Sequence, residues 1–292
     1  MPKRDVQGLT AMFARRQPSR SPLRAAPFVW GALGSAAAFA GVYLFFVRSY
    51  MGQLVDERAF AGADAWQAGF VTATQHFLNV LPYVAVGAAT LLGIAIVLVR
   101  RNWLVFVAAL AAAAAANVCT QLLKYLFLGR PQHGVADGLA NSLPSGHATV
   151  AASAALVVFL VAAPRLRPLV AMLGAIFTIV AGAATLVDQW HRPSDVVAAL
   201  LVVAFWGCAA GFVLARSRAR TALSSVAARL LTLVWIAIGC AVVAAIALVV
   251  TYVSALAGAS HLLIAYVGGL AAIIAVSFAL AAAGNRLFRW LA

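Results

Sequence analysis

The sequence predicts an all-α fold, a polytopic membrane bundle of about eight transmembrane helices. Of its 292 residues, 65% are hydrophobic and only 10% are charged, and the mean hydropathy is +0.99. A soluble domain carries about 45–50% apolar and about 25% charged residues. The apolar residues also form long runs, and a membrane-spanning helix needs about 20 of them. These observations exclude an ordinary soluble enzyme and a disordered chain.

Eight apolar stretches are long enough to span a membrane. They cover residues 27–48, 78–99, 103–128, 146–163, 168–188, 194–215, 230–254 and 262–284. The first is expected to be an uncleaved anchor, because it is longer than a signal-peptide core and no small-residue cleavage site follows it. We expect three regions: a basic arm (1–26), a six-span core (27–215), and two additional spans with a short tail (216–292).

The positive charge is explained by membrane topology. The chain has 21 Lys and Arg against 7 Asp and Glu, a net charge of +14. If the arm is cytoplasmic, 16 of the 21 basic residues lie on cytoplasmic segments, whereas all acids except Asp5 lie outside. This distribution follows the positive-inside rule. We therefore expect a protein of the cytoplasmic membrane with both termini inside, membrane lipids around it and no nucleic-acid partner.

The segment 49–77 between the first two spans is predicted to lie at the membrane interface. Acids alternate there with aromatic residues, as in an interfacial helix; they are Asp56, Glu57, Phe60, Asp64, Trp66, Phe70 and Phe77. Both a plain connector and a role in gating substrate access fit this pattern.

No metal or cofactor is expected. Cys119, Cys208 and Cys240 fall inside spans at no metal-ligand spacing, which favours a packing role. Phosphate-binding glycine loops and the metalloprotease signature are absent. The sequence does not predict the oligomeric state.

Three polar clusters lie beside the apolar spans, all on the predicted outer side. They are Lys124–Pro131, Pro144–His147 and His191–Asp195. Ionisable groups next to hydrocarbon are costly, so they indicate function, and three clusters on one face predict one site. Taken singly, each has a plainer explanation: Lys124 as a snorkelling lysine, Arg130 as a headgroup anchor, Ser145 as an ordinary cap, and His147 as an interfacial histidine. His133 and His261 are weaker candidates.

Local geometry gives the second and third clusters a chemical role. Ser145 is a natural N-cap, and a helix start with Gly146 beside it accepts an anion such as phosphate. Pro193 suits the first helical position, which lets Asp195 reach back to His191 and fix its tautomer. His191 and His147 then have unlike neighbours, which favours a nucleophile and a general acid.

The combination resembles the type 2 phosphatidic acid phosphatase family, integral-membrane lipid phosphatases related to vanadium haloperoxidases. The resemblance rests on Lys124 with Arg130-Pro131, on Pro144-Ser145-Gly146-His147, and on His191-x-x-x-Asp195. It covers residues 117–200, and the first six spans match the family's six-helix core. Usage rich in alanine and arginine suggests a bacterial member.

The resemblance implies a metal-independent hydrolysis in two steps. His191 would attack phosphorus and form a phosphohistidine, Asp195 would orient it, and His147 would protonate the leaving oxygen. Four groups would hold the phosphoryl oxygens: Lys124, Arg130, Ser145 and the Gly146 amide.

The chain departs from the family pattern at two points. The third motif begins Ser-Arg in the family, and Ala184 and Thr185 stand there instead, so a bidentate phosphate contact is missing. The Thr185 hydroxyl, Arg192 or Gln189 are the candidates to compensate. Lys124 and Arg130 are six residues apart instead of seven, about 120° around a regular helix. Gly129 and Pro131 predict that the helix ends before Arg130.

The leading hypothesis is hydrolysis of a lipid-linked phosphate at the outer face of the cytoplasmic membrane. A polyprenyl or related envelope-glycolipid phosphate is preferred over phosphatidic acid and phosphatidylglycerol phosphate. The alternatives are a lipid-phosphate binding or transport protein, and transfer of the phosphoryl group to an acceptor other than water.

Overall fold

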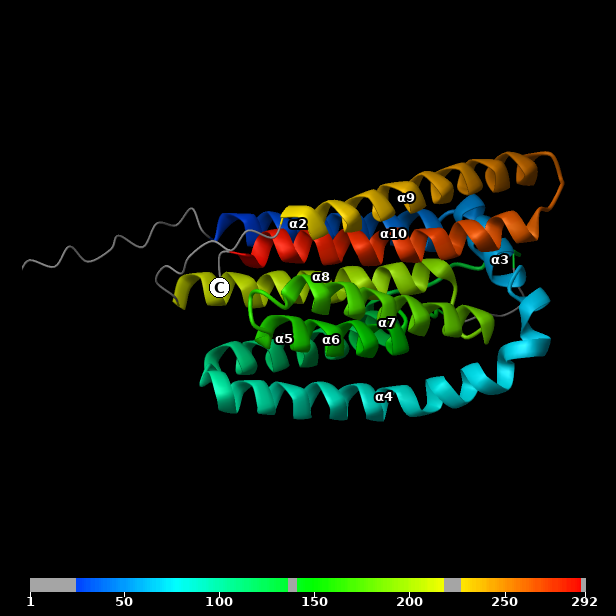
Figure 1. Ribbon diagram of the computed structural model, residues 1–292. Helices are drawn as coiled ribbons and strands as arrows, with labels where there is room; N and C mark the ends of the chain where they lie inside the picture. The colour runs from blue at the N-terminus through cyan, green and yellow to red at the C-terminus, as the bar shows by residue number, and fades with distance from the viewer. Residues whose placement is uncertain (1–24, 136–140, 218–226, 290–292) are drawn as a thin grey trace, which may run out of the picture.

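The computed structural model describes residues 25–135, 141–217 and 227–289 (Figure 1). Within these ranges all regular structure is helical. The elements are α2 (Ala26–Val42), η2 (Tyr43–Val47), α3 (Tyr50–Ala61), α4 (Asp64–Arg100), α5 (Trp103–Leu122), η3 (Leu123–Phe127), α6 (Gly146–Val161), α7 (Arg167–Val187), α8 (Pro193–Ser217), α9 (Ala227–Leu256) and α10 (Leu262–Phe288). The short π-helical segments η2 and η3 continue α2 and α5 directly.

The predicted all-helical membrane bundle is confirmed. Among the described residues, seven helices are long and apolar enough to cross a membrane, and α6 is a shorter apolar helix of 16 residues. Each of the eight predicted stretches corresponds to one of these helices. The chain is a multi-pass membrane protein. The basic arm lies outside the described residues.

The segment 49–77 forms helix α3 and the first part of α4. Helix α4 begins at Asp64 and runs for 37 residues, so it extends the predicted span 78–99 well beyond its start. An acid in the first turn stabilises a helix start. Pro82 lies inside α4 and does not end it, because neighbouring helices in a bundle can satisfy the freed backbone groups.

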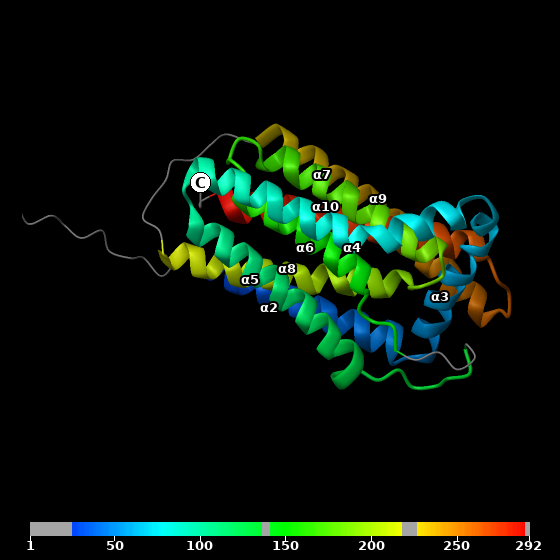
Figure 2. The same cartoon turned by 90° about the horizontal axis from the view of Figure 1, so that it is seen from below.

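Helix α8 is the central element of the bundle. It is the most buried of the long spans, and it packs against α2, α5, α6 and α10. The helices run up and down, and α3 lies at one end, together with the α5–α6, α7–α8 and α9–α10 connections (Figures 1 and 2). We call this end the α3 end. All three polar clusters of the sequence therefore lie at one end of the bundle.

Close approach of α7 to α8 depends on Gly182. A Cβ atom added there would lie 2.6 Å from Val196 Cγ1, closer than real contacts allow. Small residues permit such approach between membrane helices, where van der Waals packing drives association.

Gly182→Ala should therefore destabilise the bundle by about 1–3 kcal/mol, because overpacking displaces Val196 and with it the start of α8. A lowered thermal unfolding midpoint in detergent would reveal this effect. Gly239→Ala is the matched control, since a Cβ at Gly239 meets nothing within 4 Å. Equal midpoints for the two variants would contradict the assigned role of Gly182.

Candidate functional site

The second and third polar clusters are joined by direct hydrogen bonds at the α3 end. The Ser145 amide donates to the Asp195 carbonyl oxygen at 3.0 Å. Ser142 Oγ donates to Asp195 Oδ2 at 2.6 Å. The segment before α6 and the first turn of α8 are thus fixed to each other through Asp195.

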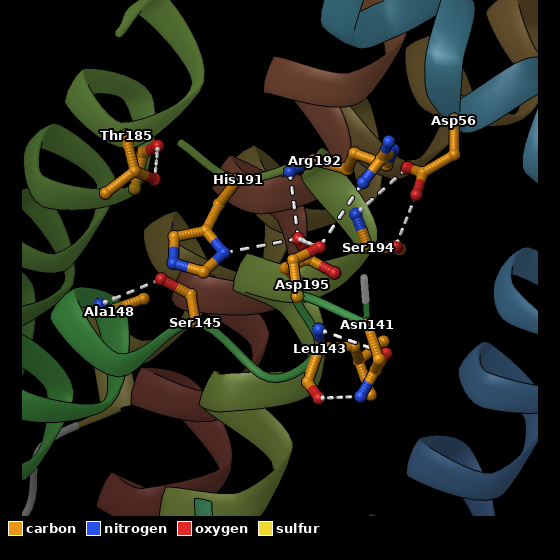
Figure 3. Close-up of polar contacts among 12 residues, drawn as sticks. Asp56, Asn141, Leu143, Ser145, Ala148, Thr185, His191, Arg192, Ser194 and Asp195 are labelled. Atoms are coloured by element: carbon orange, nitrogen blue, oxygen red, sulfur yellow. Dashed lines mark hydrogen bonds and ion pairs between the residues drawn. The ribbon is translucent and has the colours of Figure 1, made fainter. Parts of the chain in front are cut away.

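His191 and Asp195 form a buried pair, as the sequence predicts. His191 Nδ1 lies 3.2 Å from Asp195 Oδ2, and the two residues are 6% and 0% exposed (Figure 3). Helix α8 begins at Pro193, which places Asp195 in its first turn, and the Arg192 amide donates to the same carboxylate oxygen at 3.0 Å. This contact orients the imidazole through Nδ1, so its Nε2 is not used in the contact with Asp195.

The α7–α8 loop (residues 188–192) curls back onto the end of α7. Gln189 adopts a left-handed φ of 55°, which reverses the chain. The amides of Trp190 and His191 then donate to the Thr185 carbonyl oxygen at 2.9 and 3.2 Å. The backbone of Thr185 therefore holds His191 in place.

The start of α6 is open toward the site. Ser145 is the N-cap, and its Oγ accepts from the Ala148 amide at 3.4 Å, which confirms the predicted cap. A Cβ at Gly146 would meet only Gln121 Nε2, at 3.8 Å, so the backbone there is accessible. His147 follows and is half-buried, and its ring centroid lies 5.2 Å from that of a Trp190 ring. His191 and Lys124 both lie within electrostatic range of His147.

The first cluster lies where α5 ends. The π-helical segment η3 contains Lys124, and the chain is extended from Leu128, so Arg130 lies beyond the helix, as predicted. Asn141 Nδ2 donates to the carbonyl oxygens of Lys124 and Leu128, both at 3.3 Å, and of Leu143 at 2.9 Å. Sequence reasoning missed Asn141, since a single asparagine in a loop carries no distinguishing pattern.

Arg130 is a partly buried cation with an unused donor. Its Nη1 is buried and has no hydrogen-bond partner. Burial and the nearby charge of Arg192 lower the pKa of Arg130, while Asp56, Asp195 and Glu57 oppose this shift. Arginine stays charged in proteins, so this guanidinium is available to an anion.

The three candidates to replace the missing arginine are engaged elsewhere. Thr185 is fully buried, and its hydroxyl donates to the Gly182 carbonyl oxygen at 2.8 Å. Arg192 Nε donates to Glu57 Oε2 at 2.7 Å, and its guanidinium extends away from His191 toward α3 (Figure 3). Gln189 Nε2 donates to Asp64 Oδ1.

Helix α3 contacts two of the three clusters, which sequence reasoning did not anticipate. Asp56 accepts from the Ser194 amide at 3.2 Å and from Ser194 Oγ at 2.5 Å. Gln53 Nε2 donates to the Pro131 carbonyl oxygen at 2.9 Å. The acids of 49–77 were visible in the sequence, but their partners lie 125 to 138 residues away.

Outside this assembly, His133 Nε2 lies 3.0 Å from the Arg48 carbonyl oxygen, and His261 is exposed at the start of α10. Among the described residues, no group of three or more His, Cys, Asp or Glu side chains is placed to hold a metal ion.

Asp56 should make stability depend on pH. Burial, with the nearby charge of Asp195, raises the pKa of Asp56 from 3.8 to about 7, although Ser194 and Arg192 oppose the shift. As pH rises, Asp56 therefore loses its proton at a lower pH in the unfolded chain than in the folded protein. The free energy of unfolding should thus fall as pH rises from about 4 to about 7. Asp56→Asn should remove this part of the slope in thermal midpoints measured between pH 4.5 and 8. An unchanged slope would show that another group titrates.

The region that contains the candidate site matches a known protein family. Residues 105–220 match the family model described as the PAP2 superfamily, a segment that runs from α5 to just beyond α8 and includes all three clusters. Searches of curated proteins and of solved structures find no match. The family match relates residues 105–220 to the PAP2 superfamily, that of the type 2 phosphatidic acid phosphatases, and it supports a phosphatase-type activity on phosphate esters.

Proposed function

We propose that the protein hydrolyses a lipid-linked phosphate monoester or pyrophosphate through a phosphohistidine. The observation that carries the proposal is the buried His191–Asp195 pair at the same bundle end as the open start of α6. An imidazole whose Nδ1–H donates to a carboxylate presents a nucleophilic Nε2. A helix start with accessible amides binds the phosphate that this nucleophile attacks.

The reaction proceeds in two balanced steps. His191 Nε2 forms a bond to phosphorus while the bond from phosphorus to the leaving oxygen breaks, and His147 donates a proton to that oxygen. Water then attacks phosphorus and gives its proton to His147, while the bond between phosphorus and His191 Nε2 breaks. Inorganic phosphate leaves, and both histidines return to their starting states. No metal ion is required in either step.

The phosphoryl oxygens are held by Lys124, Arg130, Ser145 and the Gly146 amide. The unpartnered Nη1 of Arg130 supports this assignment, since a buried donor without a partner is costly. We assign Thr185 and Arg192 to positioning, because the Thr185 carbonyl holds the α7–α8 loop and Glu57 holds the Arg192 guanidinium.

Surroundings of the site support a lipid substrate. Tyr125, Leu126 and Phe127, next to Lys124, are 71–72% exposed, which suits contact with hydrocarbon. Helices α4 and α5 meet at the opposite end and diverge toward the α3 end, where the start of α6 lies between them (Figure 2). A polyprenyl or envelope-glycolipid phosphate is the preferred substrate, with phosphatidic acid and phosphatidylglycerol phosphate as the other candidates.

We place the α3 end at the outer face of the cytoplasmic membrane. The arginines of the opposite end support this orientation through the positive-inside rule; those described are Arg100, Arg101, Arg165, Arg167, Arg216, Arg229, Arg286 and Arg289. Of the described acids, all lie in α3, at the start of α4 or near the α7–α8 loop.

One observation favours a second function, lipid-phosphate binding or transport without turnover. The family's third-motif arginine is replaced by Thr185, whose hydroxyl is bonded inside its own helix. A site with fewer cations stabilises the charge of a transition state less well.

His191→Ala should lower phosphate release by about a thousandfold or more, because no nucleophile replaces the imidazole. Free phosphate would be measured over a panel of lipid phosphates in detergent micelles with EDTA present. His261→Ala, exposed and outside the site, should keep wild-type activity. Full activity of His191→Ala, or dependence on added metal, would overturn the mechanism. Lipid binding without turnover in the wild type, unaltered by His147→Ala, would favour the binding protein, and a phosphorylated acceptor would favour transfer.

Arg130→Gln should lower kcat/KM by about 100-fold, in line with the loss of one oxyanion-stabilising donor. His133→Gln, three residues along the same loop and exposed, is the matched control. Steady-state kinetics on the best substrate of the panel would measure both variants. Equal losses in the two would point to a disturbed loop and against a phosphate contact by Arg130.

A further inference from the structure

An apolar cavity of about 270 Å³ lies behind the first turn of α8. Its lining includes Asp56, Pro193 and Ser194, but none of the residues that we assign to catalysis or phosphate binding. Most of its wall comes from α9 and α10, which lie outside the PAP2-matching region. The two additional spans therefore create a space that the matched region alone does not contain.

Small residues build this cavity. A Cβ at Gly268 would lie 2.5 Å from Ala247 Cβ, so α9 and α10 are in close contact there. A Cβ at Gly269 would lie 2.5 Å from Pro193 Cγ, so α10 also touches the start of α8. Between these contacts, Ala244 and other short side chains leave the space open. Helix α2 packs on α8 and helix α9 on α10, and both α2 and α9 contribute to the lining.

One polar group in the lining lacks a partner. Thr251 is fully buried, and its Oγ1 makes no hydrogen bond. An unsatisfied buried hydroxyl costs about 1–3 kcal/mol, so this group favours a ligand that accepts a hydrogen bond.

A cation contacts the backbone of the same residue. Arg58 Nη1 donates to the Thr251 carbonyl oxygen at 3.3 Å, so the guanidinium of α3 is adjacent to the lining. Thr251 is five residues before the end of α9 at Leu256, about 7.5 Å along the helix axis. That depth matches the interfacial layer, which is about 5–8 Å thick on each side of a bilayer. Apolar space, hydroxyl and cation thus follow one another toward the membrane surface.

We propose that this cavity binds one acyl chain of an anionic phospholipid of the leaflet at the α3 end. The chain occupies the apolar space, an ester carbonyl accepts from Thr251 Oγ1, and the phosphate pairs with Arg58. The volume supports a single chain, because pockets for whole small molecules measure about 300–1,000 Å³. The carboxylate of Asp56 is directed to Ser194 and is not needed for the contact.

The bound lipid would support the α7–α8 loop from behind. Pro193 and Ser194 line the cavity and directly follow His191 and Arg192 in the chain. This lipid is not the substrate, and its binding does not depend on turnover.

Photolabelling tests the proposal. The full-length protein would be reconstituted in phosphatidylcholine vesicles containing phosphatidylglycerol with a diazirine in one acyl chain. Labels should map to cavity residues of α9 and α10. Ala244→Leu should reduce this labelling by about tenfold, because the added side chain fills the cavity. Thr251→Val, which keeps the shape and removes only the hydroxyl, should reduce it by about threefold to tenfold.

Controls separate the lipid site from protein folding and from catalysis. Val243→Leu, on the exposed side of α9, should label like the wild type. His191→Ala should also label fully, so a failure of the proposed hydrolysis would leave this result unchanged. Arg58→Gln should remove the preference for phosphatidylglycerol over diazirine-bearing phosphatidylcholine. Equal labelling of Ala244→Leu and wild type, or labels confined to residues outside the cavity, would overturn the proposal.

Discussion

The buried carboxylate of Asp195 accepts from Ser142 Oγ and the Arg192 amide and faces His191 Nδ1, while its backbone carbonyl accepts from the Ser145 amide. These contacts tie the start of α8, the α7–α8 loop and the segment before α6 to one residue. An uncompensated buried charge is strongly destabilising, so the carboxylate constrains all of these donors at once. The geometry of the site therefore depends on this group.

Helix α3 supplies a second layer of constraint. Glu57 holds Arg192, Asp56 holds Ser194, and Gln53 holds the carbonyl of Pro131. The helix thus connects the loop that carries Arg130 with the loop that carries His191. Positioning of this kind matters for catalysis, because small displacements of reacting groups are costly in rate. The region that matches the superfamily contains the groups that we propose to be reactive, whereas this supporting helix lies outside it.

Much of the fold followed from the sequence, because hydrocarbon imposes long apolar helices and makes stray ionisable groups conspicuous. The Ser145 cap and the reach of Asp195 to His191 were predictable because both are local contacts. The pairing of Asp56 with Ser194 joins residues 138 positions apart, and no local pattern encodes it. The bonded state of the Thr185 hydroxyl was equally hidden, since it depends on a rotamer inside α7.

Helix α4 has a consequence of a different kind. Its 37 residues extend about 55 Å, whereas the hydrocarbon core of a bilayer is about 30 Å thick. Such a helix must tilt or project, and the balance follows the hydrophobic mismatch with the surrounding lipid. Asp64 in its first turn accepts a hydrogen bond from Gln189 of the α7–α8 loop. A bilayer thickness that changed the tilt of α4 would therefore also bear on the segment that carries His191.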